Sequence, residues 1–261
     1  MGLTINTNLE AMNASRNLNN TENMLSQTMQ RLSSGLRVNT AADDVAGYAI
    51  SQSLQAQVNG LNQASQNIQD AVALAQTAQG ALNDINTMLQ RIRELGVEYL
   101  NGTTSEEDKE AISAETEQLV EEIKRVGETT QFNGVQLLSG EEEIKFQVGA
   151  DDKETIGVKA IELYKEIEDI KGVLAAEKEP LKEIDEAINK VSKLAGEFGS
   201  VQDRIQFTQS NLEVYSQNLT SAVSAITDVN MATEMTEFTK LQVLQQAGVS
   251  ILAQANQLPD A

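Results

Sequence analysis

The feature that most constrains this chain is a row of apolar residues repeated every seven positions between about Leu181 and Val229. A second row follows three residues behind the first, and the first row is apolar throughout: Ile184, Val191, Phe198, Ile205, Leu212, Leu219 and Ile226. Alternating spacings of three and four residues place both rows on one narrow face of a single helix. At about 1.5 Å per residue, that helix is roughly 70 Å long. Its apolar face is too long for a compact core, so it requires a second long helix as its partner.

The partner is predicted between about Val58 and Leu100, where the same spacing recurs. Its two rows are Leu61, Ile68, Ala75, Leu82, Leu89 and Ala64, Ala71, Ala78, Ile85, Ile92, Tyr99. Two such helices favour a mainly α fold, an elongated antiparallel bundle of long helices with coiled-coil-like packing.

Both ends of the chain carry amphipathic helices with polar faces that are mostly uncharged. One is predicted over 3–34, ending at Gly35, and the other over 231–255, after a break at Asn230. Asn and Gln cost less to bury in a packed assembly than charged residues do. We therefore expect these ends to pack against copies of the chain, with an ordinary docked terminal helix as the alternative. The residues expected to carry self-assembly are Ile5, Leu9, Leu25, Leu32, Leu244, Ile251 and Leu258.

Shorter features join these helices. Residues 35–56 are predicted to form a connector, in which Asp43 and Asp44 favour the start of the next helix. A metal site is the weaker interpretation of these two carboxylates, since no other ligand lies nearby in sequence. Thr104 and Glu107 have the spacing of a capping box at the start of a third helix.

A small β-hairpin region is predicted over 134–160. Asn133-Gly134 is a hairpin turn signal, and apolar and polar residues alternate after it. Residues 161–177 are expected to be helical or irregular, and Pro180 suits the first turn of the following long helix.

Composition excludes several classes of function. The chain has no Cys and no His, so thiolate nucleophiles, imidazole bases and the common zinc sites are absent, and no catalytic, cofactor-binding or metal residues are predicted. A formal net charge of −20 argues against nucleic acid as a partner, and no apolar run is long enough to span a membrane. The N-terminus lacks the basic and apolar regions of a secretory signal, which by itself predicts a cytoplasmic protein.

Five segments in order resemble the signatures of bacterial flagellins. They are Arg31-Leu-Ser-Ser-Gly-Leu-Arg-Val-Asn-Thr-Ala-Ala-Asp-Asp-Val-Ala-Gly, Gln90-Arg-Ile-Arg-Glu-Leu, Thr129-Thr-Gln-Phe-Asn-Gly, Gly199-Ser-Val-Gln-Asp-Arg and Leu244-Gln-Gln-Ala-Gly-Val-Ser-Ile-Leu-Ala-Gln-Ala-Asn-Gln. The resemblance covers roughly residues 1–150 and 185–259. It implies a non-enzymatic structural subunit that self-polymerises into the bacterial flagellar filament used for swimming. It also replaces the cytoplasmic prediction with secretion to an extracellular filament, because flagellins are exported without a cleaved signal.

The resemblance also implies a division of the chain. Residues 1–44 would be the N-terminal filament-core helix and connector, and 45–178 the first part of the rod domain with the β-hairpin region. Residues 179–229 would be the long C-terminal helix of the rod, and 230–261 the C-terminal filament-core helix. The segment at about 150–180, where many flagellins carry a variable domain, is short, so this looks like a minimal flagellin.

Partners follow from the resemblance as well. They are other copies of the chain, the flagellar export apparatus and its chaperone, and the cap and junction proteins. By resemblance, a vertebrate Toll-like flagellin receptor would bind at Gln90, Arg91, Leu95 and Glu115. Because Leu89 and Ile92 belong to the two inward rows, we expect Arg91 and Leu95 to be exposed beside them. The alternative is that Arg91 pairs with nearby acids and Leu95 packs under the third helix.

Two other classes compete with the filament subunit. A hook–filament junction protein shares the terminal helices, but the Gln90–Leu95 and Thr129–Gly134 segments favour flagellin. A solitary coiled-coil tether would be elongated without polymerising. An enzyme is the least favoured class, since the metalloprotease inserted in some flagellins needs His.

Overall fold

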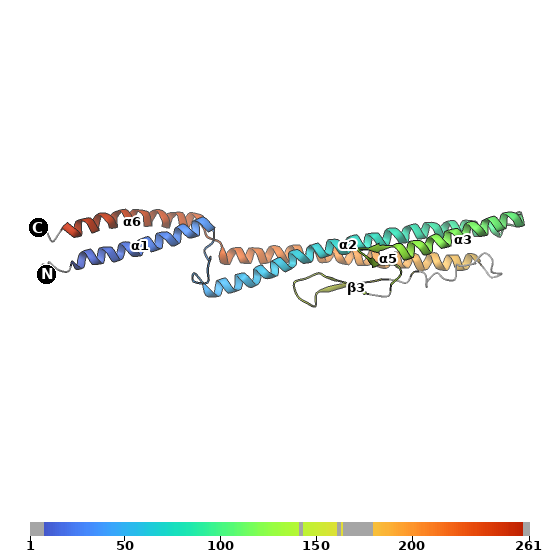
Figure 1. Ribbon diagram of the computed structural model, residues 1–261, viewed down its shortest axis with the longest axis horizontal. Helices are drawn as coiled ribbons and strands as arrows, with labels where there is room; N and C mark the ends of the chain where they lie inside the picture. The colour runs from blue at the N-terminus through green and yellow to red at the C-terminus, as the bar shows by residue number, and fades with distance from the viewer. Residues whose placement is uncertain (1–7, 141–142, 161–162, 164–179, 258–261) are drawn as a thin grey trace. The chain divides into compact units, whose positions relative to one another are not determined.

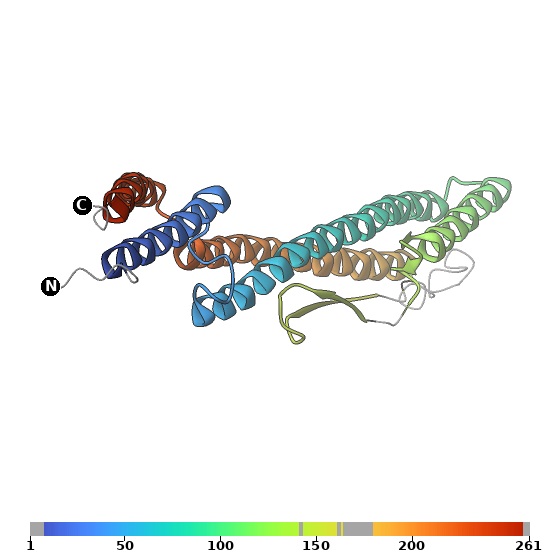
Figure 2. The same ribbon diagram turned by 60° about the vertical axis from the view of Figure 1, so that its left-hand side comes forward.

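A computed structural model describes residues 8–140, 143–160, 163 and 180–257 (Figures 1 and 2). The helices are α1 (Leu9–Ser34), α2 (Val45–Tyr99), α3 (Glu106–Thr129), α5 (Pro180–Thr227) and α6 (Met231–Gln257). The strands are β1 (Gln131–Phe132), β2 (Val135–Gln136), β3 (Glu143–Gln147) and β4 (Thr155–Lys159). The mainly α class is confirmed. The predictions for Ile5, Leu258 and most of 161–177 lie outside the described residues.

The chain divides by its internal contacts into two compact units. We call residues 1–58 with 217–261 the terminal unit, and residues 59–216 the rod unit. These limits fall inside α2 and α5. The domain limits expected at 44/45 and 229/230 fall at the start of α2 and between α5 and α6, and the one expected at 178/179 lies outside the described residues. All three remain a proposal.

The core of the rod unit consists of the heptad rows found in the sequence. Every member of the α2 rows from Leu61 to Ile92 is buried, as are Ile184, Val191, Phe198, Ile205 and Leu212 of α5. The two helices run antiparallel, because Arg93 pairs with Asp185 at 2.6 Å while the Ser216 hydroxyl lies 3.4 Å from Asn62 Oδ1. Tyr215, the member of the second row that follows Leu212 by three residues, is exposed. The long-helix pairing is therefore confirmed.

The third helix packs beside α2 and begins one residue later than the sequence pattern suggested. The capping box is formed by Ser105 and Asp108, with Asp108 N–H donating to Ser105 Oγ at 3.2 Å. The predicted Thr104–Glu107 box is wrong, because the Thr104 hydroxyl donates instead to the Glu98 carbonyl at 2.9 Å. That bond fixes the turn between α2 and α3.

Two small hairpins follow α3. Asn133 and Gly134 have φ angles of 48° and 82°, the left-handed pair that a tight hairpin turn requires, and they join β1 to β2. β3 and β4 pair antiparallel, with Phe146 opposite Ile156. The β region predicted over 134–160 is confirmed, and the Asn67 side chain donates to the Gln147 carbonyl at 3.0 Å, which ties this hairpin to α2.

The connector between α1 and α2 is shorter than predicted. It ends at Asp44 rather than at residue 56, because the Asp44 carboxylate accepts a hydrogen bond from Gly47 N–H at 2.9 Å and thus caps α2. Asp43 accepts hydrogen bonds from the backbone of Thr40 at 2.9 Å and of Asn39 at 3.1 Å. These bonds close the turn and hold the pKa of Asp43 below its ordinary value of 3.8.

In the terminal unit, α1 and α6 lie side by side and antiparallel (Figures 1 and 2). Asn8 at the start of α1 donates from Nδ2 to the Ala255 carbonyl at 2.7 Å. Gly35 ends α1 with a φ of 72°, as predicted. The connectors at the other end of the pair join through the backbone, with Val229 N–H donating to Gly35 O at 3.0 Å and Arg37 N–H donating to Thr227 O at 2.6 Å.

Candidate assembly interface

The terminal helix pair buries little of its apolar surface. In α1 only Thr28 is buried, and in α6 only Leu241 and Ala255. Ten large apolar side chains of the pair are exposed, and we call them the terminal-helix face: Leu9, Met12, Met24, Met29, Met231, Met235, Val243, Leu244, Val249 and Ile251. An exposed apolar surface of this extent is typical of a protein–protein interface.

On α6, residues spaced seven apart form two rows, one with Leu241, Gly248 and Ala255 and the other with Leu244 and Ile251. The row with Leu241, Gly248 and Ala255 faces α1. A Cβ added to Gly248 would lie 3.2 Å from Leu18 Cδ1, so the helices approach closely there, between buried Leu241 and Ala255. The other row, with Leu244 and Ile251, is left exposed.

The residues predicted for self-assembly therefore divide into three groups. Leu9, Leu244 and Ile251 are exposed and belong to the terminal-helix face. Leu25 and Leu32 are half-buried within α1, and Ile5 and Leu258 lie outside the described residues. The sequence pattern identified the helices correctly but did not separate the inward rows from the outward rows.

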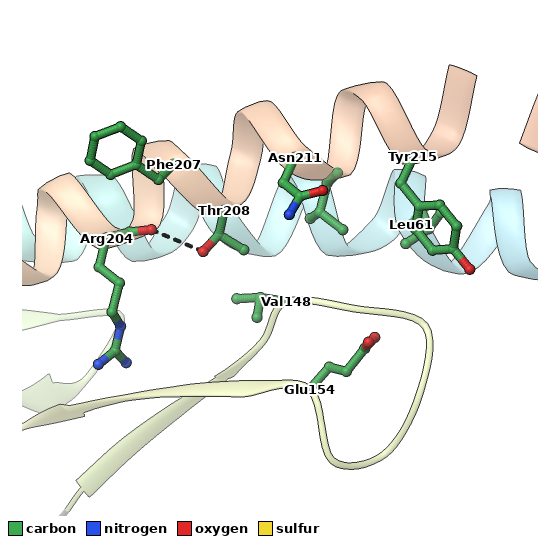
Figure 3. Close-up of a pocket in the computed structure, with 9 residues that line it drawn as sticks. Leu61, Val148, Glu154, Arg204, Phe207, Thr208, Asn211 and Tyr215 are labelled. Atoms are coloured by element: carbon green, nitrogen blue, oxygen red, sulfur yellow. Dashed lines mark hydrogen bonds between the residues drawn. The ribbon is translucent and has the colours of Figure 1, made fainter. Parts of the chain in front are cut away.

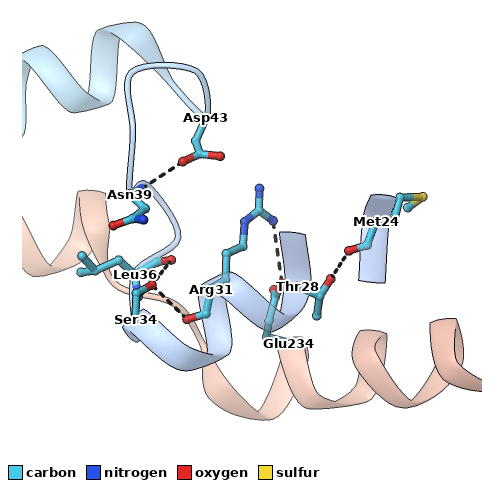
Figure 4. A network of polar contacts seen from close by, with 8 residues as sticks. All are labelled: Met24, Thr28, Arg31, Ser34, Leu36, Asn39, Asp43 and Glu234. Carbon is cyan, nitrogen blue, oxygen red and sulfur yellow. Dashed lines mark hydrogen bonds and ion pairs between the residues drawn. The ribbon is translucent and has the colours of Figure 1, made fainter. Parts of the chain in front are cut away.

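Polar contacts hold the connector end of the helix pair (Figure 4). Arg31 of α1 forms an ion pair with Glu234 of α6, with Nη1 and Oε1 3.9 Å apart. Ser34 Oγ accepts from the Leu36 backbone N–H at 3.1 Å, and the Arg37 guanidinium donates to the Ile226 carbonyl. These bonds orient the two helices and leave their outer apolar side chains uncovered.

The rod unit has a second exposed apolar surface, on α5. Phe207 is 79% exposed, and Val214 and Tyr215, two turns further along the helix, are exposed as well; we call these three residues the α5 face. Phe207 points away from the β3–β4 hairpin, whereas Arg204 points toward it (Figure 3). Beside them is an open cleft of about 390 Å³, lined by residues that include Leu61, Val148 and Glu154.

Charges are distributed unevenly along the helices that carry this surface. α2 has no charged residue from Val45 to Gln69, and α5 has only Glu213 between Ile205 and Thr227. The first half of α5, from Pro180 to Arg204, carries nine: Lys182, Glu183, Asp185, Glu186, Lys190, Lys193, Glu197, Asp203 and Arg204. The α5 face thus lies on the uncharged half of its helix. The sequence analysis did not predict the α5 face. The available signal was Phe207, an aromatic residue that belongs to neither heptad row of its helix.

Of the four residues expected to bind a receptor, three are exposed on the surface and one is buried. Gln90, Arg91 and Glu115 are exposed, and Arg91 donates to Glu115 Oε1 from Nη2 at 3.0 Å and to Glu94 from Nη1 at 3.2 Å. The hydrogen bonds to Glu115 and then Glu94 raise the pKa of Arg91. Leu95 is only 2% exposed and belongs to the rod core with Ile112 of α3, so its expected exposure is wrong. Leu95 is buried because α3 covers it, and periodicity along α2 alone cannot show which helix covers a residue.

The described residues contain no cluster of three or more acidic side chains able to hold a metal ion. Among the same residues, no helix is both long and apolar enough to cross a bilayer.

Comparisons with known proteins agree with the geometry. The family model for the bacterial flagellin N-terminal helical region matches residues 5–143, and that for the C-terminal helical region matches residues 181–261. The flagellin of Halalkalibacterium halodurans is 45% identical and that of Bacillus subtilis 38%, each over 98% of this chain and 97% of the relative. A crystal structure of Bacillus cereus flagellin is 27% identical, with a TM-score of 0.51 over 56% of this chain and 88% of that one.

The matches extend over both terminal helices and both long helices, the elements that carry the two exposed surfaces. They do not favour the hook–filament junction protein, and they assign a structural rather than an enzymatic role. Flagellins form the filament that lies outside the bacterial cell. The chain belongs to the bacterial flagellin family and is a structural subunit that polymerises into the flagellar filament.

Proposed function

We propose that polymerisation buries two surfaces of this subunit, the terminal-helix face and the α5 face. The observation that carries the proposal is Phe207, a large aromatic side chain that is 79% exposed on a helix half almost without charge. Burying such a ring stabilises a contact by about 1.5–3 kcal/mol. Aromatic side chains of this kind are the usual centres of binding energy in interfaces.

Electrostatics supports the same assignment. Each copy carries a formal net charge of −20, so two copies repel one another at long range. Close packing is least unfavourable through surfaces with few charges, because charged groups lose hydration when they are buried without partners. The terminal-helix face and the α5 face meet that requirement, whereas the first half of α5 does not.

The α5 face is tested by Phe207→Ser in a seeded polymerisation assay. Loss of the buried ring should raise the critical concentration about 10- to 150-fold, as expected from about 1.5–3 kcal/mol. Val97→Ser is the matched control, because Val97 is also exposed but lies at the end of α2 where charged residues recur. Equal critical concentrations for Phe207→Ser and the parent protein would remove the α5 face from the proposal.

The terminal-helix face is tested by Ile251→Ser on the outward row of α6. We expect this variant also to raise the critical concentration, with unchanged helix content by circular dichroism, since Ile251 is exposed. A variant that polymerises like the parent protein would show that the outward row is not buried in the filament.

Before assembly, the terminal-helix face needs protection from aggregation. We infer that an export chaperone covers it in the cell and that the flagellar export apparatus then delivers the chain to the cap and junction proteins at the growing filament. The exposed apolar side chains of α6 are the surface that such a chaperone would cover. Ile251→Ser should weaken chaperone binding in a titration, and unchanged affinity would place the chaperone elsewhere.

A second proposed function is recognition of the free subunit by a vertebrate Toll-like flagellin receptor. The exposed Gln90, Arg91 and Glu115 support it, and Leu95 would act only by supporting the surface from below. Because Arg91 is already bound to Glu115 and Glu94, a receptor acid would have to replace these acceptors.

The test compares Arg91→Ala with Arg125→Ala in a receptor-activation assay on depolymerised protein. Arg125 is the matched control because it is exposed and pairs with Glu122 within α3. We expect only Arg91→Ala to lose activation. Equal activity of both variants would contradict a receptor site at Arg91.

A further inference from the structure

Methionine is concentrated on the terminal-helix face, where it supplies five of the ten exposed apolar side chains. The described residues include six methionines, and five of them lie exposed on the terminal helix pair: Met12, Met24, Met29, Met231 and Met235. Their exposed fractions are all between 49% and 54%. The sixth, Met88 of α2, is half-buried against the rod core.

These thioethers are the groups most easily oxidised in the chain. The sequence has no Cys, no Trp and no His, which removes the other side chains that peroxides attack readily. Exposure decides which thioethers react, so the structure separates five accessible sulfur atoms from Met88.

Four of the five lie toward one end of the helix pair. Met24 and Met29 are on the last turns of α1, and Met231 and Met235 are on the first turns of α6. The ion pair between Arg31 and Glu234 brings these two stretches together. Met12 lies toward the other end of α1.

We propose that these five methionines are an oxidation site that makes assembly sensitive to peroxide. In each, the sulfur lone pair attacks one oxygen of hydrogen peroxide, the O–O bond breaks, and the other oxygen leaves as water after proton transfer. The thioether becomes a sulfoxide and the peroxide is reduced. The inference rests on the proposed burial of the terminal-helix face.

The physical consequence follows from the change in polarity. Flexible thioethers fill irregular apolar gaps well, and so suit an interface between copies. A sulfoxide oxygen is a strong hydrogen-bond acceptor, and burying it without a donor is unfavourable. Oxidised subunits therefore add to the filament less favourably, whereas methionines already buried in a filament are protected.

The experiment treats the monomeric full chain with hydrogen peroxide and maps sulfoxides by peptide mass spectrometry. We expect Met12, Met24, Met29, Met231 and Met235 to oxidise well before Met88. The oxidised protein should show a critical concentration at least about tenfold higher in seeded polymerisation, as one unsatisfied buried acceptor implies. Methionine sulfoxide reductase should restore assembly.

Two variants separate the site from nonspecific damage. In Met88→Leu the five sites remain, so peroxide should inhibit assembly as in the parent protein. In a variant with all five methionines changed to Leu, the ratio of critical concentrations after and before peroxide should be near one. If that ratio matches the parent protein, or if oxidised parent protein assembles normally, the oxidation site is refuted.

If the variant with all five methionines changed to Leu does not assemble before peroxide treatment, the test is the treatment of oxidised parent protein with methionine sulfoxide reductase. Restored assembly of the parent protein after reduction supports the proposal, and no restoration overturns it. Unoxidised parent protein that fails to polymerise at all would overturn the proposed burial itself, and the oxidation inference with it.

Discussion

Leu82→Ala is the sharpest test of the paired heptad rows. Leu82 is 0% exposed on α2 and belongs to the same core cluster as Phe198 of α5. The substitution removes three carbon atoms, worth about 2.4 kcal/mol of transfer free energy at about 0.8 kcal/mol each. The cavity left between two rigid helices adds to this, so we expect a loss of about 3–5 kcal/mol in the free energy of unfolding.

The assay is thermal unfolding of the monomer followed by circular dichroism, since the chain has no Trp to report by fluorescence. A loss of about 3–5 kcal/mol should lower the Tm by roughly 6–20 °C in a chain of this size. Val97→Ala is the control on the same helix; it is exposed, and its change should stay within about 0.5 kcal/mol. A Tm for Leu82→Ala within about 2 °C of the control would refute the assignment of this row to the core.

Three further predictions concern the terminal unit. The pKa of Asp43 is lowered in the folded chain, so its contribution to stability is present above the ordinary pKa of 3.8 and is lost as the pH falls through the lowered value. An NMR titration of Asp43 should therefore give a midpoint below 3.8. A midpoint at or above 3.8 would contradict the turn geometry. Gly35→Ala should cost about 1 kcal/mol, because Gly35 has a φ of 72°; an unchanged Tm would show that the connector adapts. Limited proteolysis of the monomer should trim α1 and α6 first and leave a fragment near residues 45–225, because few residues of the helix pair are buried; loss of this fragment at the same rate would refute this order.

The sequence by itself determined the long helices and their inward faces. Heptad spacing is a local property, so the rows through Leu61 and Ile184 fixed which face of each helix is buried before any partner was known. Gly35, Pro180 and Asn133-Gly134 likewise marked their turns or helix ends correctly, because backbone preference is local too. The family followed from motif order alone.

Only the tertiary structure decided what covers each remaining face. Leu95 is buried because α3 lies over it, and Leu244 is exposed because the close approach at Gly248 turns the other row of α6 toward α1. The exposure of Phe207 follows in the same way from the absence of a covering segment among the described residues of the rod unit. Periodicity tells which residues share a face, but only the packing of elements distant in sequence tells whether that face meets another helix, water or a second copy of the chain.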